Sequence, residues 1–436
     1  MAALYAPAEA RGTICLPRQG VREKSATMNE SRLGKFLGIN GTILALSIAR
    51  MADGIANSIL FVMIPLYAAK LPDKLIHLPL PLIVGVLIAA YGVAAAGLQP
   101  VTAALVDRMG HHKRFIQAGL VLICLATLAF ILAVRYLDLL GLRIAQGCGL
   151  ALEIPSTMAL MAILTRRESR GASMGFYTTM RMLGLALGPL AGGLLHDRLG
   201  FNAAFYTAAA ILLLAVLVVQ FGVANVQTAE MSSAGRKHRF IDPSLVTSSI
   251  VSAGFATFIV ASAFTLITTL ENEFNSRLSI TAFGFATAFS ALMIGRIVFQ
   301  LPLGKLSDRF GRKPFVLFGL LLLAPVTAFL GEVTTLLEFI LLRFIQGLAA
   351  AAIIAPALAL AGDEARAGGH GRQMSIVTMG FGWGIAFGPL LAGVLSIYSF
   401  KLPFWASGGL SLIGAVVVII FMSETVPKRD ADKSHD

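Results

Sequence analysis

The sequence predicts an all-α membrane protein, with twelve transmembrane helices arranged in two pseudo-symmetric six-helix bundles. Two observations support this fold class. Hydrophobic residues make up 57% of the 436 residues and charged residues only 13%, which is too little charge to cover the surface of a water-soluble fold of this size. The second observation is an internal repeat, in which three motifs recur in the same order 200 or 201 residues later.

The repeated motifs lie in three pairs of segments spread over both halves of the chain. In an apolar chain, a repeat of this length indicates two homologous membrane halves, an architecture found in proteins that move solutes across bilayers. The paired segments are QPVTAALVDRMGHHKR (99–114) and QLPLGKLSDRFGRK (300–313), RIAQG (143–147) and RFIQG (343–347), and GLALGPLAGG (184–193) and GIAFGPLLAG (384–393).

Apolar stretches of about 20 residues, enough to cross a bilayer, follow one another along almost the whole chain. The predicted spans are 40–69, 82–106, 115–134, 138–164, 174–195, 202–224, 245–270, 279–304, 314–332, 335–361, 374–398 and 404–423. These spans divide the chain into a disordered N-terminal segment (1–35), a first bundle (36–224), a linker (225–243), a second bundle (244–424) and a C-terminal tail (425–436).

The net charge of +12 is distributed as in a membrane protein rather than in a nucleic-acid-binding protein. With the N-terminus inside, the inner loops and both tails hold 24 Lys and Arg residues and the outer loops hold 6. Because positively charged loops stay on the cytoplasmic side, this bias predicts that both termini are cytoplasmic. The short loops favour a bacterial plasma (inner) membrane, and no nucleic-acid partner is expected.

Several chemistries lack the residues that they need. All seven histidines lie in loops, tails or span ends, which argues against a metal site or a histidine proton relay within the membrane. No G-x-x-x-x-G-K-[ST] motif is present to bind ATP. We therefore expect no cofactor, no metal and no catalytic residues, and the chain is not predicted to be an enzyme.

The segments DRMGHHKR and DRFGRKP each fall in a short link between two spans, where a glycine permits a tight turn. The second copy resembles the loop signature of the major facilitator superfamily throughout, whereas the first departs from it at Ala103 and His111. The resemblance covers residues 40–424 and implies a cytoplasmic gating role for these loops. The residues concerned are Asp107, Arg108, Gly110, Gly304, Asp308, Arg309, Gly311 and Arg312.

The GLALGPLAGG segment has glycines every four residues, so that one helix face is bare and a neighbouring helix can approach closely. The alternative is ordinary packing of small residues. The segment is similar to the helix motif of antiporters in this superfamily, and the run IPLY (64–67) resembles the twelve-span drug/proton antiporter branch. The motif residues are Gly184, Gly188, Pro189, Gly192 and Gly193.

Charged residues within the spans are costly and therefore candidates for function. The acids Asp53 and Glu153 fall in spans 1 and 4, which the resemblance places on the central cavity, and both are candidate proton carriers. For Asp53 the alternative is a structural ion pair with Arg50, three residues away on one helix face. Glu153 can equally be structural. The basic candidates for the cavity are Arg50, Arg143, Arg181 and Arg296, whereas Arg343 is expected to be structural.

The resemblance implies a proton-coupled secondary active transporter that works by alternating access, most readily an antiporter that exports small amphiphilic compounds. Its expected partners are a small-molecule substrate, protons and the lipid bilayer, and a monomer is the default state. One alternative is a proton-coupled uptake symporter for a small metabolite. A remote alternative is a membrane sensor or scaffold that transports nothing.

Overall fold

We analysed a computed structural model, which describes residues 40–71, 78–165, 170–225, 247–363 and 370–424. The predicted N-terminal segment 1–35, the linker from residue 226 onward and the tail 425–436 lie outside these residues. The described parts of the chain are entirely helical, with thirteen α-helices and one short 3-10 helix, η1 (Phe130–Leu132).

The first half of the chain, as we use the term, comprises the first six helices and the second half the remaining seven. The first-half helices are α2 (Gly41–Lys70), α3 (Leu80–Met109), α4 (His112–Ala129), α5 (Tyr136–Leu164), α6 (Arg170–Leu199) and α7 (Phe201–Gly222). Those of the second half are α8 (Ser248–Thr269), α9 (Glu271–Leu278), α10 (Ala282–Phe310), α11 (Arg312–Phe329), α12 (Leu336–Asp363), α13 (His370–Leu395) and α14 (Leu402–Phe421).

Ten of the described helices are long and apolar enough to cross a membrane, and the chain is an integral membrane protein. Helices α5 and α6 contain 29 and 30 residues, comparable in length to the others, but are not among these ten. The helices correspond one by one to the predicted spans, except that α9 was not predicted. Its sequence, ENEFNSRL, is short and polar.

The sequence predicts that the repeated charged motifs lie in loops. In the structure they lie mainly in helix ends. Helix α3 extends through Arg108 and ends at Gly110, whose φ of 64° is a left-handed conformation that glycine adopts readily. Helix α10 extends through Arg309, and Gly311, with a φ of 106°, alone separates it from α11. The glycines therefore form the turn, and the charged residues before them belong to the last helical turn.

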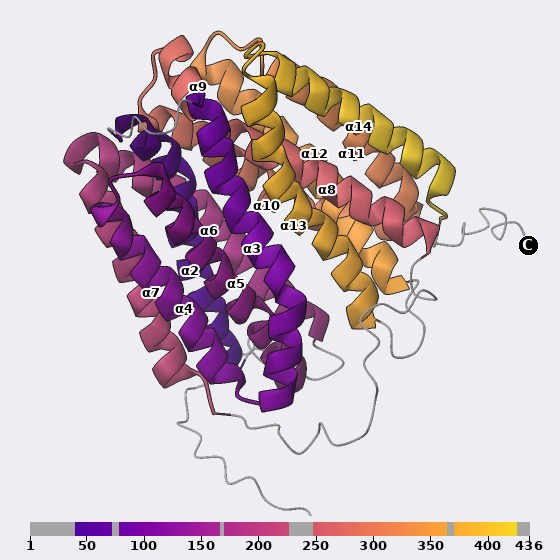
Figure 1. Cartoon of the computed structure of the whole chain (residues 1–436). Helices are drawn as coiled ribbons and strands as arrows, with labels where there is room; N and C mark the ends of the chain where they lie inside the picture. The colour runs from indigo at the N-terminus through magenta and orange to yellow at the C-terminus, as the bar shows by residue number, and fades with distance from the viewer. Residues whose placement is uncertain (1–39, 72–77, 166–169, 226–246, 364–369, 425–436) are drawn as a thin grey trace, which may run out of the picture.

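Successive long helices, leaving the short α9 aside, alternate in direction, which gives the molecule two ends (Figure 1). The α9 end contains α9 and the junction of α6 with α7. The turn end contains the turns from α3 to α4 and from α10 to α11. Helix α3 packs against α13, and α6 against α10, so that these two pairs join the halves of the chain.

Close contacts between the halves occur at the α9 end. Asn272 Nδ2 donates a hydrogen bond to the Pro65 carbonyl oxygen at 2.9 Å, and the Phe283 amide donates one to Asp197 Oδ2 at 3.0 Å. A β-carbon added to Gly193 would lie 2.7 Å from Phe283 Cα, so α6 and α10 touch without an intervening side chain. The halves are thus closed against each other at this end.

The sequence repeat reappears as a repeated hydrogen-bond network. In the first half, Arg143 Nη1 donates to Gln146 Oε1 at 3.1 Å, and Gln146 Nε2 donates to Thr127 Oγ1 at 3.0 Å. In the second half, Arg343 contacts Gln346 at 2.6 Å and Gln346 contacts Thr327 at 2.9 Å, through the same atoms. In each half, therefore, an arginine binds a glutamine on its own helix, and that glutamine binds a threonine on the preceding helix.

Candidate functional site

A buried charge cluster lies in the first half of the chain, where α2 meets α5. Arg50 Nη1 contacts Asp53 Oδ2 at 2.8 Å and both oxygens of Glu153 at 3.1 Å. All three side chains are 3% exposed. The pairing of Arg50 with Asp53 agrees with their spacing of three residues, and Glu153 joins them from a distant part of the chain. One guanidinium therefore holds two carboxylates.

Aromatic and amide groups surround this cluster. Asn57, one turn after Asp53 on α2, donates from Nδ2 to the Tyr91 hydroxyl at 2.5 Å. The Tyr91 ring in turn lies under the Arg143 guanidinium, 4.8 Å from the ring centroid. Tyr177 on α6 is buried, and its hydroxyl has no hydrogen-bond partner among the described residues. Neutral hydrogen-bonding groups, namely the Asn57 amide and the hydroxyls of Tyr91 and Tyr177, thus lie around the cluster.

Sequence analysis singled out none of Asn57, Tyr91 and Tyr177. A signal was present, because each places a polar group inside an apolar stretch, and Asn57 follows Asp53 by four residues on the same helix face. A tyrosine is nevertheless common in membrane helices, and only the packing of α3 and α6 against α2 reveals which tyrosines reach the cluster.

Arg143 and Arg343 are both completely buried and occupy equivalent places in the two halves. Arg143 binds Gln146 and lies over the rings of Tyr91 and Phe61. Arg343 binds Gln346 and lies over two phenylalanine rings of its own half, those of Phe264 and Phe289. Because aromatic faces attract cations, the rings help to hold each guanidinium, and neither forms an ion pair with an acid in the described part of the chain.

Arg181 and Arg296 form no ion pair with any described residue, unlike Arg50. Arg181, on α6, attracts the carboxylates of Asp53 and Glu153 electrostatically and repels Arg50. Arg296, on α10 in the other half, is close enough to Arg181 for the two guanidinium groups to repel each other. Its Nε donates to Gln300 Oε1 at 3.3 Å. One arginine thus lies on each side of the junction of α6 and α10, and the two together make this junction positively charged.

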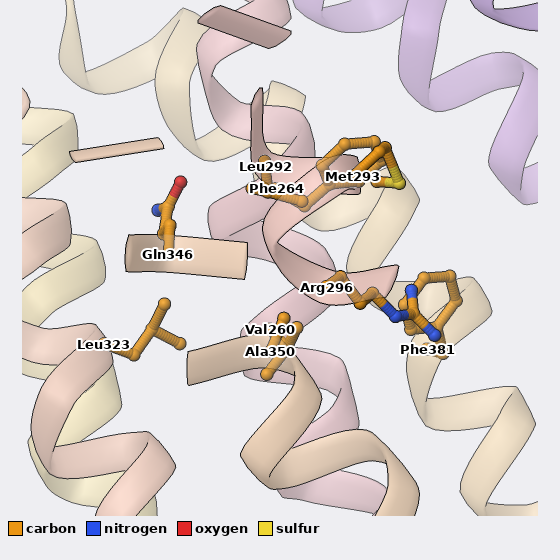
Figure 2. A pocket seen from close by; sticks show the side chains of 9 residues that line it. All are labelled: Val260, Phe264, Leu292, Met293, Arg296, Leu323, Gln346, Ala350 and Phe381. Atoms are coloured by element: carbon orange, nitrogen blue, oxygen red, sulfur yellow. The ribbon is translucent and has the colours of Figure 1, made fainter. Parts of the chain in front are cut away.

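A small pocket in the second half adjoins Arg296. Figure 2 shows Arg296 pointing toward the Phe381 ring on one side of this pocket, with Gln346 on the other side. The guanidinium carbon lies 5.9 Å from the ring centroid. The pocket is mainly apolar, and its lining residues are Val260, Phe264, Leu292, Met293, Arg296, Leu323, Gln346, Ala350 and Phe381.

The glycine motif determines how closely α6 approaches the charged helix α2. A β-carbon at Gly184 would overlap the Met51 carbonyl oxygen, and one at Gly188 would overlap the Ile55 carbonyl oxygen. Gly192 packs against Ile59, whereas Gly193 faces α10. Pro189 lies within the same helix, which continues to Leu199. The motif therefore brings Arg181 near Arg50 and Asp53 by allowing backbone contact.

The second charged turn motif forms a network at the turn end of the molecule. The Arg312 guanidinium binds Asp308 one turn earlier, the Ser307 hydroxyl at 3.1 Å and Asp363 at 3.2 Å, which lies at the end of α12. The backbone amides of Arg312 and Lys313 donate to the Glu424 carboxylate at 2.8 and 3.0 Å. This motif therefore ties α10, α11 and α12 to Glu424, three residues beyond the end of α14.

The first copy of this motif shares one contact with the second. Lys113 Nζ donates to the carbonyl oxygens of Gln220 and Val223, at the end of α7, at 2.7 and 2.8 Å, and Lys313 Nζ donates in the same way to the Ile419 carbonyl oxygen of α14 at 2.7 Å. Arg108 is exposed in the last turn of α3. In the second copy, Lys305 and Arg309 of α10 are also exposed. The two copies thus share the contact of the lysine with the last helix of their half, whereas the conformation of the turn glycine differs, with φ 64° and ψ 10° at Gly110 and φ 106° and ψ 154° at Gly311.

Comparison with known proteins was consistent with this arrangement. Residues 46–284 and 249–436 each match the profile of the Major Facilitator Superfamily. The chain is 27% identical to the multidrug resistance protein MdtG of Escherichia coli over 379 residues, which is 83% of this chain and 90% of MdtG. It is 28% identical over 333 residues to an uncharacterised MFS-type transporter, YuxJ, of Bacillus subtilis, covering 72% of this chain and 81% of YuxJ.

Solved structures with low sequence identity share the fold. A D-xylose-proton symporter matches with a TM-score of 0.74 at 15% identity, over 88% of this chain and 98% of that protein. A bacterial homologue of the human lysosomal transporter Spinster, in an inward-facing and occupied conformation, matches with a TM-score of 0.70 at 14% identity, over 86% and 95% of the two chains. Together with the profile match over both halves, these likenesses identify the chain as a member of the Major Facilitator Superfamily, a family of membrane transporters.

Proposed function

We propose that the chain is a proton-coupled secondary active transporter, an antiporter that exports small amphiphilic compounds by alternating access. Residues 36–224 and 244–424 would form two six-helix bundles, with twelve spans in all, related by a pseudo-twofold axis along the membrane normal. The 225–243 linker joins them. Rocking of these bundles exposes a central path first to one side of the membrane and then to the other.

The observation that carries this proposal is the sharing of Arg50 by Asp53 and Glu153 in a buried cluster. One guanidinium balances one carboxylate, so the second carboxylate is balanced either by the more distant Arg181 or by a proton. A proton on Glu153 weakens its bond to Arg50 and so loosens the contact of α5 with α2. Proton binding at this place is therefore linked to the packing of two helices that line the path.

Two further features support export over uptake. The complete glycine motif of α6 resembles that of antiporters, and in this structure it packs against the helix that carries Arg50 and Asp53. The relative MdtG is described as a multidrug resistance protein, and extrusion of toxic compounds is one basis of such resistance.

The remaining predictions concern the setting of the transporter. We propose that both termini are cytoplasmic in a bacterial plasma (inner) membrane, so that the turn end faces the cytoplasm and the α9 end faces outward. The two charged turns then act as cytoplasmic gates, with Arg312 and its acids holding the second-half helices together. A single chain contains the whole path and is expected to work as a monomer.

Transport by purified protein in liposomes tests the proposal. A pH gradient is imposed, acidic inside, and uptake of fluorescent lipophilic compounds into these liposomes is followed for the wild type, Asp53→Asn and Glu153→Gln. We expect uptake against the compound's own gradient by the wild type, collapse with a protonophore, and loss of gradient-driven uptake in both variants to the level of protein-free liposomes.

The matched control is Glu332→Gln, which neutralises an exposed acid that pairs with Lys401 at the surface. Surface ion pairs contribute little, so this variant should transport like the wild type. Wild-type activity in both Asp53→Asn and Glu153→Gln would reduce the cluster to a structural ion pair. Movement of the substrate together with protons, rather than against them, would contradict antiport.

A second candidate function is proton-coupled uptake of a small metabolite, and the unpaired arginines favour it. Arg181 and Arg296 leave positive charge at the junction of α6 and α10, which attracts an anion. A proton added to Asp53 or Glu153 makes the region more positive, so a proton and an anion strengthen each other's binding. That linkage is typical of symport. The same liposome assay, with organic anions in place of the fluorescent lipophilic compounds, distinguishes the two functions.

A further inference from the structure

A buried acid at the α9 end takes no part in the central cluster. Glu271 begins helix α9 and is completely buried. Neither of its carboxylate oxygens has a hydrogen-bond partner among the described residues. An ionised carboxylate in such surroundings would have lost its hydration without gaining a donor or a counter-ion, which is strongly unfavourable. Glu271 therefore fits this conformation only as the neutral acid.

The charges around Glu271 reinforce this conclusion. Helix α9 packs against α2, α8 and α10. Its Phe274 also contacts Phe339 of α12 and Phe404 of α14, where the charged residues at this end are Glu338, which is an acid, and Lys401, which pairs with Glu332. Helix α8 contains no charged residue, and the first charged residue of α10 is Arg296, about four turns into the helix. At this end of α2 the charged residue is Lys70, which is exposed and lies over the Phe201 ring. None of these three helices offers Glu271 a cation at the α9 end.

The nearest acids and bases lie on α6 and on α9 itself. Asp197, at the end of α6, repels a negative charge on Glu271. On α9, Arg277 stacks on the Phe400 ring at 4.0 Å, and Glu273 is a further acid. Burial, and then the charge of Asp197, raise the pKa of Glu271 well above its ordinary value. The geometry and the electrostatics thus agree.

Glu271 is buried because the two halves of the chain meet around it. The next residue, Asn272, donates to the Pro65 carbonyl oxygen of α2 at 2.9 Å. The acid that repels Glu271, Asp197, accepts the Phe283 amide of α10 at 3.0 Å. Both hydrogen bonds cross from one half to the other beside Glu271. If the halves separated at the α9 end, these bonds would break and water would reach the carboxylate.

We propose that Glu271 is a second proton-binding site, which must hold a proton for the α9 end to close and which releases it when that end opens. The proton is taken from the outer solution onto the carboxylate before closure and returns to that solution on reopening, so no other reactant is needed. This inference rests on the proposed alternating access and outward orientation of the α9 end, but not on the role of Asp53.

Distance measurements between spin labels at the α9 end test this inference. Ala69→Cys on α2 and Ser276→Cys on α9 place labels on exposed positions of opposite halves, in a background in which Cys15, Cys124 and Cys148 are replaced by serine. Full-length protein in lipid nanodiscs is examined from acidic to alkaline buffer. We expect the short-distance population to fall several-fold as the pH rises, and to stay constant at its acidic level in Glu271→Gln.

Controls separate this site from its neighbours and from the central cluster. Glu273→Gln removes an acid two residues away and should keep the wild-type pH response, as should Asp53→Asn. Glu271→Met, which is also neutral and of similar volume, replaces Glu271→Gln if the latter is not monodisperse. An unchanged pH response in the neutral variants, or no pH response in the wild-type background, would overturn the inference.

The liposome assay and the spin-label measurement test the two proposed proton sites separately, so that either proposal can be contradicted while the other is supported. Loss of the pH response in Glu271→Gln together with normal transport by Asp53→Asn and Glu153→Gln would support the outer proton site and contradict the proposed central one. Normal pH gating in Glu271→Gln together with inactive Asp53→Asn would do the reverse.

Discussion

At Arg50, one guanidinium is the common partner of two carboxylates in a setting with almost no access to solvent. Sequence spacing predicted half of this arrangement, because Arg50 and Asp53 are three residues apart on a helix. It was not possible to predict that Glu153 would share the same guanidinium. That contact depends on the rotation of α5 about its axis, which the side chains of several helices set together.

Replacing Arg50 with glutamine should therefore destabilise the protein strongly. Removing one partner of a buried ion pair costs about 3–5 kcal/mol, because the remaining charges are left uncompensated. The loss should be smaller in acidic than in alkaline buffer, since the stranded carboxylates can take up protons. Thermal unfolding in detergent measures the effect, with Arg277→Gln, at an exposed position, as control.

The same reasoning predicts a rescue. Adding Asp53→Asn and Glu153→Gln to Arg50→Gln removes the uncompensated charges and should restore most of the lost stability. Equal stability of Arg50→Gln and the wild type in alkaline buffer would mean that the ion pairs contribute nothing to the fold.

Among the helices, α6 shows how a glycine motif sets the distance between two packed helices. Its glycines lie against backbone carbonyl oxygens of α2, and those of α13 lie similarly against α8, where Gly384 meets Phe258 and Gly388 meets Ser262. Sequence analysis predicted a bare helix face from the four-residue spacing. It did not identify the partner helix, because any neighbour can use such a face, and Gly193 in fact serves a different one, α10.

Two alanine substitutions within α6 should therefore have opposite effects. Gly184→Ala introduces a methyl group into the Met51 carbonyl and should destabilise the protein by about 1–3 kcal/mol, as overpacking does. Gly175 has open space around it, and Gly175→Ala should be stabilising by up to about 1 kcal/mol through helix propensity. Thermal unfolding of both variants checks this, and similar effects of the two would show that α6 does not need the close approach.

Helix α9 is the element that the sequence did not predict. Its eight residues are polar and follow directly on α8, so neither hydrophobic periodicity nor length distinguished it from a loop. Its stability comes from tertiary contacts, since Phe274 is buried against the rings of Phe339, Phe400 and Phe404. Local sequence carries little information about such a helix.

For the whole molecule, closure at the α9 end depends on two acids in opposite protonation states. Burial alone would raise the pKa of Asp197, but hydrogen bonds from the Thr281 side chain and the Phe283 amide outweigh it and hold the pKa below its ordinary value. Stabilisation by ionised Asp197 is thus present above the ordinary aspartate pKa and is lost only as the pH falls through the lowered value. The pH dependence that Glu271 contributes has the opposite sign, because its pKa is raised in the closed state. Its contribution to closure is fully present when the pH lies below the ordinary glutamate pKa, and it is lost as the pH rises through the raised value.

Asp197→Ala should accordingly open the α9 end under conditions in which Glu271 is neutral. The substitution leaves the amide of Phe283, at the start of α10, without its acceptor, at a cost of about 1 kcal/mol, or about five-fold in the ratio of closed to open molecules. The spin-label pair used for Glu271 measures this ratio in mildly acidic buffer. An unchanged ratio would show that the hydrogen bond between the halves does not contribute to closure.

The repeated arginine–glutamine–threonine network has a consequence for how the two halves diverged. Both copies retain the same scaffold of buried cation, amide and hydroxyl. The position of Glu153 is taken by Ile353 in the second copy, where it packs against Gly319 as Glu153 packs against Gly119, and α8 has no charge at all. The acids that share Arg50 in the first half therefore have no counterpart at the equivalent places of the second half. The second half keeps the buried arginine, glutamine and threonine without these acids, so comparing the two halves isolates what the acids of the Arg50 cluster add to a common frame.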